Sequence, residues 1–274
     1  HDLHAEATLH FLSAGKHVLV EKPMANSEDE CRQMIDAAAA ADRKLMVAYC
    51  MRYHPLVRRM KEAIDNREYG EVFQVSIWTE QHTEPKAPHW ALEAKRLGGG
   101  QFFSHGCHYI DILLWYLGRP VRGVHLGTNR GTPWLEKEGT SNAVIEFEDG
   151  IMGYHFGTWG ARGSRLVYSF HAHCTEGMLE ADIITGKLIA HVRGEQTVLF
   201  ETPPGKPMSR QMNHFLDCIE NDTQPFTDPI SSIEGLRVIW KLYEAEPTAA
   251  MADLRGEGLG TWTPECPPMP PMNW

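Results

Sequence analysis

The sequence predicts a protein in two parts. A parallel α/β sheet comes first, and an antiparallel sheet with its helices segregated to one side follows. Three observations predict this. Residues 3–66 alternate helical and strand patterns, which is the signature of a parallel sheet. Between residues 71 and 201, runs of β-type alternation follow one another around a single helical interlude. Helical spacing then returns at 208–221 and 230–245.

The first part is expected to contain three helices and two strands. The helices are predicted at about 3–14, 28–41 and 55–66, and the strands at 17–20 and 44–50. Gly15 is placed to end the first helix, and Ser27 with Glu30 forms a capping box that starts the second. The short apolar run at 17–20 is typical of a strand buried on both faces of a sheet. These elements make about half of a doubly wound domain.

The second part is expected to be mainly β structure. Strands are predicted at 71–81, 121–129, 140–148, 151–159, 165–173, 177–190 and 195–201. The sequence Glu148-Asp149-Gly150 is a hairpin signal between two of them. The helical interlude covers about 89–117, and the proline-rich tail 264–274 is expected to be irregular.

Composition excludes several classes of protein. The net charge of −10 is spread without a basic stripe, so no nucleic-acid partner is expected. No run reaches the roughly 18–20 apolar residues of a membrane helix, so no membrane partner is expected either. Six scattered cysteines without a CxxC pair predict reduced thiols and a cytoplasmic protein. The chain opens without Met inside a helical unit, which suggests a fragment or a processed start.

The segment Val18-Leu19-Val20-Glu21-Lys22-Pro23 delivers two charges to the end of a buried strand. Open α/β sheets bind ligands at the carboxyl ends of their strands. Pro23 keeps Lys22 out of helical geometry, so the lysine is expected to be extended at that edge. The plain alternative is a solvated strand end.

The stretch GGGQFFSHGCHYID at 98–111 leads into a helix with two distinct sides. At 100° per residue, one stripe carries Ser104, His108, Asp111 and Trp115. Nearly opposite lie Ile110, Leu113, Leu114 and Leu117. The helix is therefore expected to bury its leucine face and to present the polar stripe.

Two groups of histidines raise the question of a metal site. His105 and His108 are three residues apart on the expected helix, and His171, His173 and Cys174 lie in an expected strand. Only His171 and His173 share a face of that strand, and neither histidine pair has a third carboxylate or thiol obviously paired with it, so no metal is predicted.

Five segments carry a resemblance to a known family. HAEATLHFLSAGKHVLVEKPMANSEDE, KLMVAYCMRYHP, EYGEV, GGGQFFSHGCHYIDILLWYLG and, more loosely, QMNHFLDCIENDTQPFTDPISSIEGLRVI resemble, in order and spacing, the glucose–fructose oxidoreductase / inositol dehydrogenase (Gfo/Idh/MocA) family. The resemblance implies that residues 1–70 form the C-terminal portion of a Rossmann NAD(P)-binding domain. It also implies that 71–274 form an α+β substrate-binding and oligomerisation domain with an open-faced antiparallel sheet.

The resemblance also implies a set of site residues. Lys22 matches the lysine that contacts the reacting oxygen, and His108 matches the usual general base. The expected cofactor-binding residues are those that line the nicotinamide side of the cleft or orient the lysine: Glu21, Pro23, Arg52, Tyr53 and Trp90. The implied cofactor is NAD or NADP.

The chain departs from the family pattern in two places. Ser104 stands where most members carry an aspartate, so we expect the proton acceptor to work alone or with His105, and Ser104 to assist catalysis. The fingerprint G-x-G-x-x-G that binds the pyrophosphate does not occur in the sequence. The chain is therefore expected to lack the N-terminal part of the Rossmann domain.

The expected function is that of an NAD(P)-dependent oxidoreductase acting on a sugar, sugar derivative or cyclitol, in a homo-oligomeric (dimeric or tetrameric) protein. NAD-dependent glycoside cleavage and a non-catalytic binding or regulatory paralogue are the alternatives. Four residues of the second part, Trp159, Arg162, Arg165 and Tyr168, are expected on sheet surface or an interface, with the cleft as the other possibility.

Overall fold

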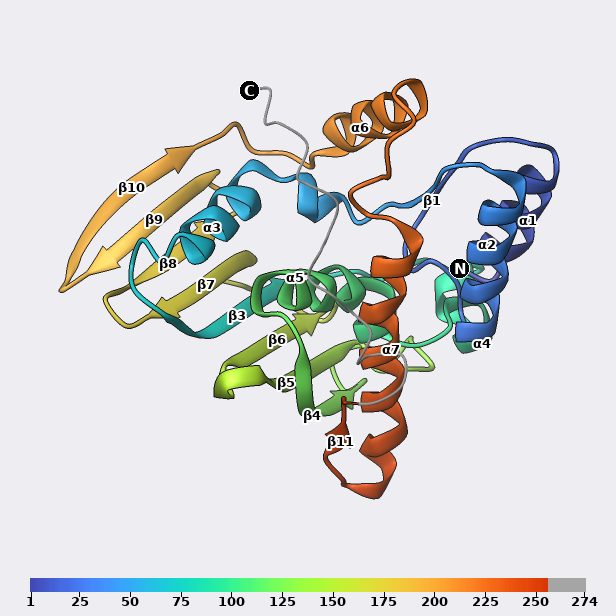
Figure 1. Ribbon diagram of the computed structural model, residues 1–274. Coiled ribbons are helices and arrows are strands. Elements are labelled where there is room, and N and C mark those ends of the chain that lie inside the picture. Colours follow the sequence, from blue (N-terminus) through green and yellow to red (C-terminus); the bar gives the residue numbers. More distant parts are fainter. Residues whose placement is uncertain (256–274) are drawn as a thin grey trace.

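The computed structural model describes residues 1–255, which fold around two sheets (Figure 1). The smaller sheet is the parallel pair β1–β2. The larger one has nine strands in the order β10-β9-β8-β7-β3-β6-β5-β4-β11. Its neighbouring strands are antiparallel except for β3 and β6, which run parallel. The predicted combination of a small parallel sheet and a large, mostly antiparallel sheet is confirmed.

The first part alternates helices and strands as predicted. Its elements are α1 (His4–Ser13), β1 (Val18–Val20), α2 (Glu28–Ala41), β2 (Leu45–Val47), the 3-10 helix η1 (Cys50–Tyr53) and α3 (Pro55–Asp65). The capping box is formed: the Ser27 hydroxyl accepts from the Glu30 amide, and the Glu30 carboxylate accepts from the Ser27 amide.

The strands of the large sheet match most predicted runs. They are β3 (Val72–Glu80), β4 (Pro120–Thr128), β5 (Thr140–Phe147), β6 (Met152–Thr158), β7 (Tyr168–Cys174), β8 (Gly177–Asp182), β9 (Lys187–Val192), β10 (Glu195–Glu201) and β11 (Ala252–Asp253). The single strand predicted at 177–190 is wrong. It divides into β8 and β9 because the chain turns at Gly186, whose φ of 73° suits a glycine.

The remaining helices connect or cover the sheet. They are η2 (Trp90–Leu92), α4 (Ala94–Leu97), the π-helix η3 (Phe102–Gly106), α5 (Cys107–Leu117), η4 (Glu148–Gly150), α6 (Met208–Glu220), α7 (Pro229–Ala245) and η5 (Glu246–Thr248). Pro229 at the first turn of α7 and the Asp228 cap explain where that helix starts.

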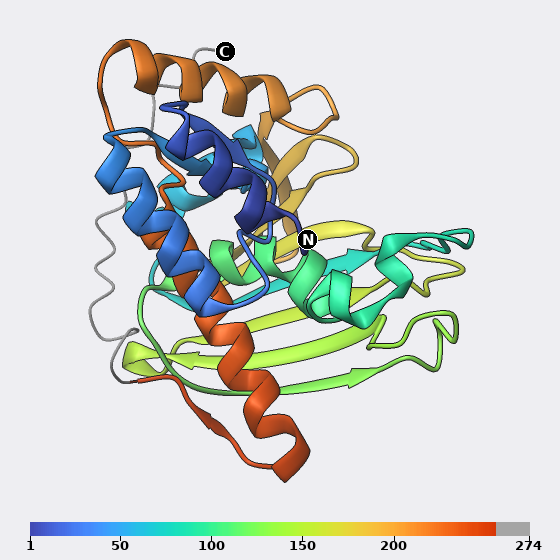
Figure 2. The ribbon, with the colours of Figure 1, turned by 90° about the vertical axis from the view of Figure 1, so that its right-hand side faces the viewer.

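Helix α5 is buried on every side, so of the predicted polar stripe only Ser104, which precedes the helix, reaches the cavity. All its residues from Cys107 to Leu117 are buried. The helix lies between the large sheet and α7, with η1 against it (Figures 1 and 2). Its polar side chains are buried because the protein covers them: the Asp111 carboxylate is paired with Arg52.

One face of the large sheet is covered by helices. Helix α3 packs against β8, β9 and β10, α5 packs against β6, and α7 against β4 (Figure 2). Helix α3 therefore belongs by packing to the large sheet, whereas the predicted boundary lies after it at residue 70. Helix α7 also contacts α2 and β2, and Thr227 exchanges two hydrogen bonds with Val47, which joins the two parts.

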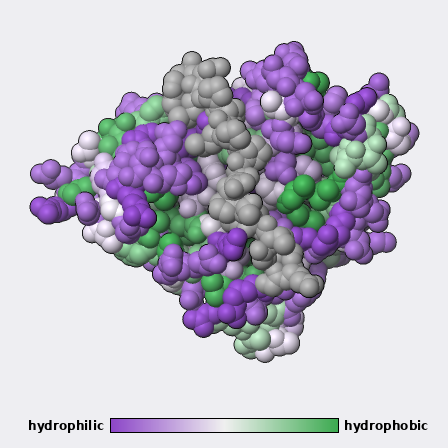
Figure 3. Space-filling model, in the orientation of Figure 1, coloured by the Kyte–Doolittle hydropathy of each residue, from purple (hydrophilic) through white to green (hydrophobic). Residues whose placement is uncertain are grey.

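The thiols and the surface agree with the composition. The five cysteines within the described residues are free and buried, whereas Cys266 and the tail 264–274 lie outside those residues. In the described part of the chain, no helix is both long and apolar enough to cross a membrane. The face in Figure 3 is mostly hydrophilic, with small hydrophobic patches.

Candidate functional site

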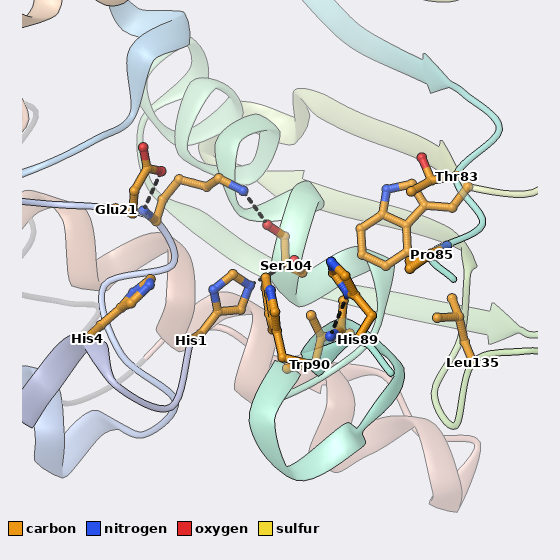
Figure 4. A pocket seen from close by; sticks show the side chains of 13 residues that line it. His1, His4, Glu21, Thr83, Pro85, His89, Trp90, Ser104 and Leu135 are labelled. Carbon is orange, nitrogen blue, oxygen red and sulfur yellow. Dashed lines mark hydrogen bonds between the residues drawn. The ribbon is translucent and has the colours of Figure 1, made fainter. Parts of the chain in front are cut away.

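A cavity of about 390 Å³ lies where the end of β1 meets the start of the α5 region. Its walls come from α1, the residues after β1, the loop after β3, segment 89–97 and η3, with Leu135 and Trp159 (Figure 4). Strand β1 therefore ends at a cavity, as the rule for parallel sheets predicts.

Lys22 reaches from the end of β1 to the π-helix. Its Nζ donates a 2.8 Å hydrogen bond to the backbone carbonyl of Ser104. The exposed Glu21 carboxylate accepts from the Lys22 amide at 3.3 Å. The Lys22–Pro23 peptide bond is cis, and Pro23 is buried. Glu21 and Lys22 both line the cavity, as predicted for a ligand-binding strand end.

His4 fixes the turn that follows Lys22. Its Nδ1 lies 2.8 Å from the Pro23 carbonyl oxygen, which can only accept, so Nδ1 carries the proton. Burial lowers the pKa of His4, so the ring is neutral and Nε2 is left as an acceptor. Sequence reasoning missed His4, although its position in the quoted HAEATLHF segment was a signal.

Ser104 contacts a histidine that sequence reasoning also missed. The Ser104 Oγ lies 2.9 Å from Nε2 of His1, and Ser104 is 6% exposed. The His1 ring packs edge-on against Trp90 at 4.9 Å, and Figure 4 shows it between His4 and Ser104. Because residues 102–106 form a π-helix, Ser104 does not stand one regular α-turn before His108.

His105 has partners other than those predicted for it. Its Nδ1 lies 3.3 Å from the Gln101 amide nitrogen, and its Nε2 lies 3.4 Å from the Tyr109 hydroxyl and 3.3 Å from that of Tyr168. The Gln101 carbonyl oxygen accepts from Ser141, which leaves the amide nitrogen to donate to His105. The ring nitrogens of His105 are therefore engaged away from His108.

His108 lies deep in the protein. It is 8% exposed, packs edge-on near Tyr49, and is not among the residues that line the cavity. Burial and the nearby Lys22 ammonium hold its pKa well below the usual range, so the ring is neutral. Its buried Nδ1 has no hydrogen-bond partner within the described chain. Its role as general base stays a prediction.

Arg52 and Tyr53, predicted to line the nicotinamide side of the cleft, lie in the interior. Both are at most 2% exposed. The Arg52 guanidinium makes two hydrogen bonds to Asp111, at 2.7 and 2.6 Å. Tyr53 packs edge-on against Phe226. This arrangement offers neither side chain to the cavity, because each is committed to core contacts.

Aromatic side chains form the far wall of the cavity. Trp90 lines it and stacks on His89 with 5.6 Å between the ring centres, while its predicted contact with a cofactor stays a prediction. Trp159 also lines it and packs with Leu97 and Leu135, whereas the sequence favoured a surface or interface position. The chain from 160 to 167 is not a strand, so the strand predicted at 165–173 begins only at Tyr168.

Arg162 and Arg165, which the sequence grouped with Trp159 and Tyr168, lie in the loop from 160 to 167. Arg162 is exposed and places its guanidinium 5.9 Å from the centre of the Trp134 ring. Arg165 is also exposed. Tyr168 donates to the Gln81 side chain at 2.8 Å.

The glycine triplet 98–100 lets the chain pass close to other elements. Gly98 ends α4 with a φ of 82°. A Cβ on Gly100 would lie 2.1 Å from the carboxyl carbon of Glu138. The Tyr243 hydroxyl accepts from the amides of Gly100 and Phe103 and donates to Glu138.

The start of the π-helix is thereby held from two sides. The Glu138 carboxylate also accepts from the Phe102 amide at 3.3 Å. An acceptor pair at the free amides of a helix start stabilises that start. Tyr243 comes from α7 and Glu138 from the loop before β5, so two distant segments fix the position of Ser104.

No metal site was predicted, and residues 1–255 contain no group of three or more His, Cys, Asp or Glu side chains arranged to hold an ion. His171 instead bonds to Ser169 at 2.8 Å and approaches Glu180 on β8.

Two family models match this chain in succession. Residues 1–49 match an oxidoreductase family with an NAD-binding Rossmann fold, and residues 57–180 match the Gfo/Idh/MocA C-terminal domain. The gap between the two matches falls at η1, just before the packing partners change at α3.

Known proteins resemble the chain over most of its length. A 1,5-anhydro-D-fructose reductase of Ensifer adhaerens is 26% identical, covering 92% of this chain and 77% of the relative. An inositol 2-dehydrogenase of Saccharopolyspora erythraea is 25% identical, covering 99% and 76%.

A solved structure agrees as well. The crystal structure of aldose-aldose oxidoreductase from Caulobacter crescentus superposes with a TM-score of 0.82 at 25% identity, covering 92% of this chain and 76% of that one. The two successive family matches and the shared fold agree with one another. The chain belongs to the Gfo/Idh/MocA family of NAD-binding oxidoreductases.

Proposed function

We propose that this chain performs the substrate half of an NAD(P)-dependent dehydrogenase reaction on a hydroxyl of a sugar, sugar derivative or cyclitol. The observation that carries the proposal is the Lys22–Ser104 contact at the cavity. The fixed Lys22 ammonium and the buried Ser104 residue line the same cavity, where their polar groups can hold a substrate oxygen. The relatives named for sugar and inositol reactions support the substrate class.

The residues around the cavity fit the nicotinamide end of the cofactor. The cavity opens at the carboxyl end of β1, and the indole of Trp90 provides a flat wall for a ring. When bound there, the cofactor supplies hydride acceptance or donation. Glu21, Lys22 and Trp90 are the residues that would hold it, whereas Arg52 and Tyr53 are engaged in the core. Because the sequence contains no G-x-G-x-x-G turn, the proposal is limited to the nicotinamide end.

Lys22 has hydrogens left for a substrate. One of its three N–H bonds goes to the Ser104 carbonyl, and two remain for an oxygen in the cavity. The carbonyl holds the ammonium in place before substrate arrives, so little reorganisation is needed as negative charge develops on the reacting oxygen.

The test is the rate of nicotinamide reduction by the full-length protein over a panel of sugars and inositols. Lys22→Met is expected to lower kcat about 10²–10³-fold, because it removes the group that stabilises charge. The exposed Lys16→Met, placed before β1, is the matched control and should keep the wild-type rate.

Other outcomes of the same panel contradict the proposal. Release of a chromogenic alcohol from glycosides, without net nicotinamide reduction, would indicate glycoside cleavage. Binding of sugars without turnover by the wild type would indicate a non-catalytic paralogue.

We also propose a homo-oligomer formed through the open face of the large sheet. That face carries half-buried aromatic side chains, among them Trp78, Tyr154 and Phe156, which pack on one another. Sedimentation analysis tests it: Trp78→Glu should shift the wild-type oligomer toward monomer, and a monomeric wild type would contradict it.

A further inference from the structure

We propose that Gly106 is a positioning residue for Lys22. It allows residues 102–106 to close as a π-helix against the large sheet, and this π-helix directs the Ser104 carbonyl to the Lys22 ammonium. The inference rests on the proposed dehydrogenase function, in which Lys22 holds the reacting oxygen. The lysine is then positioned by a segment about 80 residues away along the chain, because residues 22 and 104 are 82 positions apart.

Gly106 is required by the space around it and not by its backbone conformation. Its φ of −59° and ψ of −24° are ordinary helical values. A Cβ at this position would lie 2.9 Å from Cδ2 of Phe102 and 3.2 Å from Cε1 of His155. Both of these side chains are fully buried, and His155 belongs to β6, against which η3 packs. A methyl group at position 106 therefore has to push η3 away from the sheet.

The two side chains that enclose Gly106 are held by further ring contacts. Phe102 stacks on His125 of β4, with 4.3 Å between the ring centres and 13° between the ring planes. His155 stacks on Tyr109 of α5 at 5.3 Å and 12°. Because these partners lie in the sheet and in a buried helix, the rings have little room to move. The backbone of η3 is the part that we expect to shift.

Both ends of this segment are anchored to other parts of the fold. At the start, the amide of Gln101 donates to the Glu138 carbonyl at 2.7 Å. Further along, the Asp111 carboxylate is paired with Arg52. A π-turn takes up one residue more than an α-turn. With the two ends fixed, the π-helix accommodates a residue that a regular α-helix between the same anchors would exclude.

The π-helix also explains why a backbone carbonyl is available to Lys22. Its hydrogen bonds join residues five apart, whereas those of an α-helix join residues four apart. Where the π-helix gives way to α5 at Cys107, one carbonyl is in excess of the helix amides. The Ser104 carbonyl fits this description, because it accepts from two side chains, the Lys22 ammonium at 2.8 Å and the Cys107 thiol at 3.6 Å. In a regular α-helix it would accept from the His108 amide instead.

The kinetic test is a double-mutant cycle in the full-length protein, measured as kcat/KM for polyol oxidation. Gly106→Ala should lower kcat/KM about 10–10²-fold in the wild-type background, because a small displacement of a group at the reacting oxygen is costly. In the Lys22→Met background the same substitution should lower kcat/KM less than about 2-fold, since the group that Gly106 positions is already absent. An equal loss in both backgrounds would overturn the proposal.

Gly153→Ala is the matched control. A Cβ at this β6 position would lie 2.6 Å from the Phe147 ring, so the substitution also overfills the buried side of the sheet. Its effect on kcat/KM should be the same with Lys22 and with Met at position 22. If Gly153→Ala also loses its effect in the Lys22→Met background, the coupling is a general result of destabilisation and the role of Gly106 is refuted.

A structural measurement needs no turnover. In a crystal structure of Gly106→Ala, Lys22 Nζ should lie beyond about 3.5 Å from the Ser104 carbonyl oxygen, and a retained hydrogen bond would overturn the proposal. If this variant does not fold, Phe102→Leu/Gly106→Ala should fold and keep the contact, because the smaller side chain leaves room for the methyl group. A double variant that stays unfolded, or folds without the contact, would overturn the steric argument. If the wild type oxidises no polyol, the proposed function fails, and these structures still decide whether Gly106 positions Lys22.

Discussion

The Arg52 guanidinium donates two hydrogen bonds to the Asp111 carboxylate, and each residue is 1% exposed. The pair joins η1, which follows β2, to the buried helix α5. Arg52 also reaches the Phe226 carbonyl at 3.4 Å, so three distant segments meet at one side chain. An ion pair this deep is expensive to break, because the surviving partner keeps its charge away from water.

Asp111→Asn should therefore lower the free energy of unfolding by about 3–5 kcal/mol. The double variant Arg52→Met/Asp111→Leu leaves neither charge alone. Its loss of stability should therefore be smaller than the sum of the losses in the single variants Arg52→Met and Asp111→Leu. Urea denaturation measures both.

The surface pair Arg122–Glu146 is the control, because Arg122 is 56% exposed. Arg122→Met should cost less than about 1 kcal/mol. Additive losses in the Arg52–Asp111 cycle would show that the pair has no coupling.

The glycine triplet gives a steric prediction. Gly100→Ala would place a methyl group 2.1 Å from the carboxyl carbon of Glu138, so the loop or the π-helix must shift. We expect a loss of about 1–3 kcal/mol of stability together with reduced turnover. Gly163→Ala is the control, because a Cβ there meets nothing within 4 Å and its φ is not positive. Equal effects of the two substitutions would refute the steric argument.

Tyr243 gives a prediction about the start of the π-helix. Tyr243→Phe removes the acceptor of the Gly100 and Phe103 amides and the donor to Glu138, at nearly constant volume. The expected loss is about 1–3 kcal/mol, since buried groups lose their partners. Amide hydrogen exchange at 100–104 should accelerate, and unchanged protection there would contradict the capping role.

Two buried histidines predict a loss of stability in acid. Burial lowers the pKa of His54 to about 4 and that of His155 to about 3, from 6.5 in the unfolded chain. Below pH 6.5 the unfolded chain therefore binds protons that the folded chain does not. Stability should fall by up to about 1.4 kcal/mol per pH unit for each histidine, until the folded pKa is reached.

The measurement is the free energy of unfolding between pH 7 and pH 4. His155→Phe removes one titrating group from a position stacked on Tyr109, so its slope should be shallower than that of the wild type. Equal slopes would argue against a neutral, buried His155.

Local sequence patterns determined most of the elements. The capping box at Ser27, the two late helices α6 and α7, and the strand β1 that ends just before Glu21-Lys22 all follow from spacing and caps within a few residues. The sequence also shows directly that a serine stands at position 104, four residues after the glycine triplet. These features depend on neighbours in the chain, which a sequence shows directly.

Tertiary structure decided which of those residues meet. Periodicity placed Ser104 and Asp111 on one stripe of a helix, but the sheet, α7 and η1 cover that helix on all sides. In this packing Asp111 forms an ion pair with Arg52. Ser104, in the π-helix, contacts His1 through its hydroxyl and Lys22 through its carbonyl. A helical pattern tells which side chains share a face. Only packing between segments far apart in the chain determines which face is buried and against what.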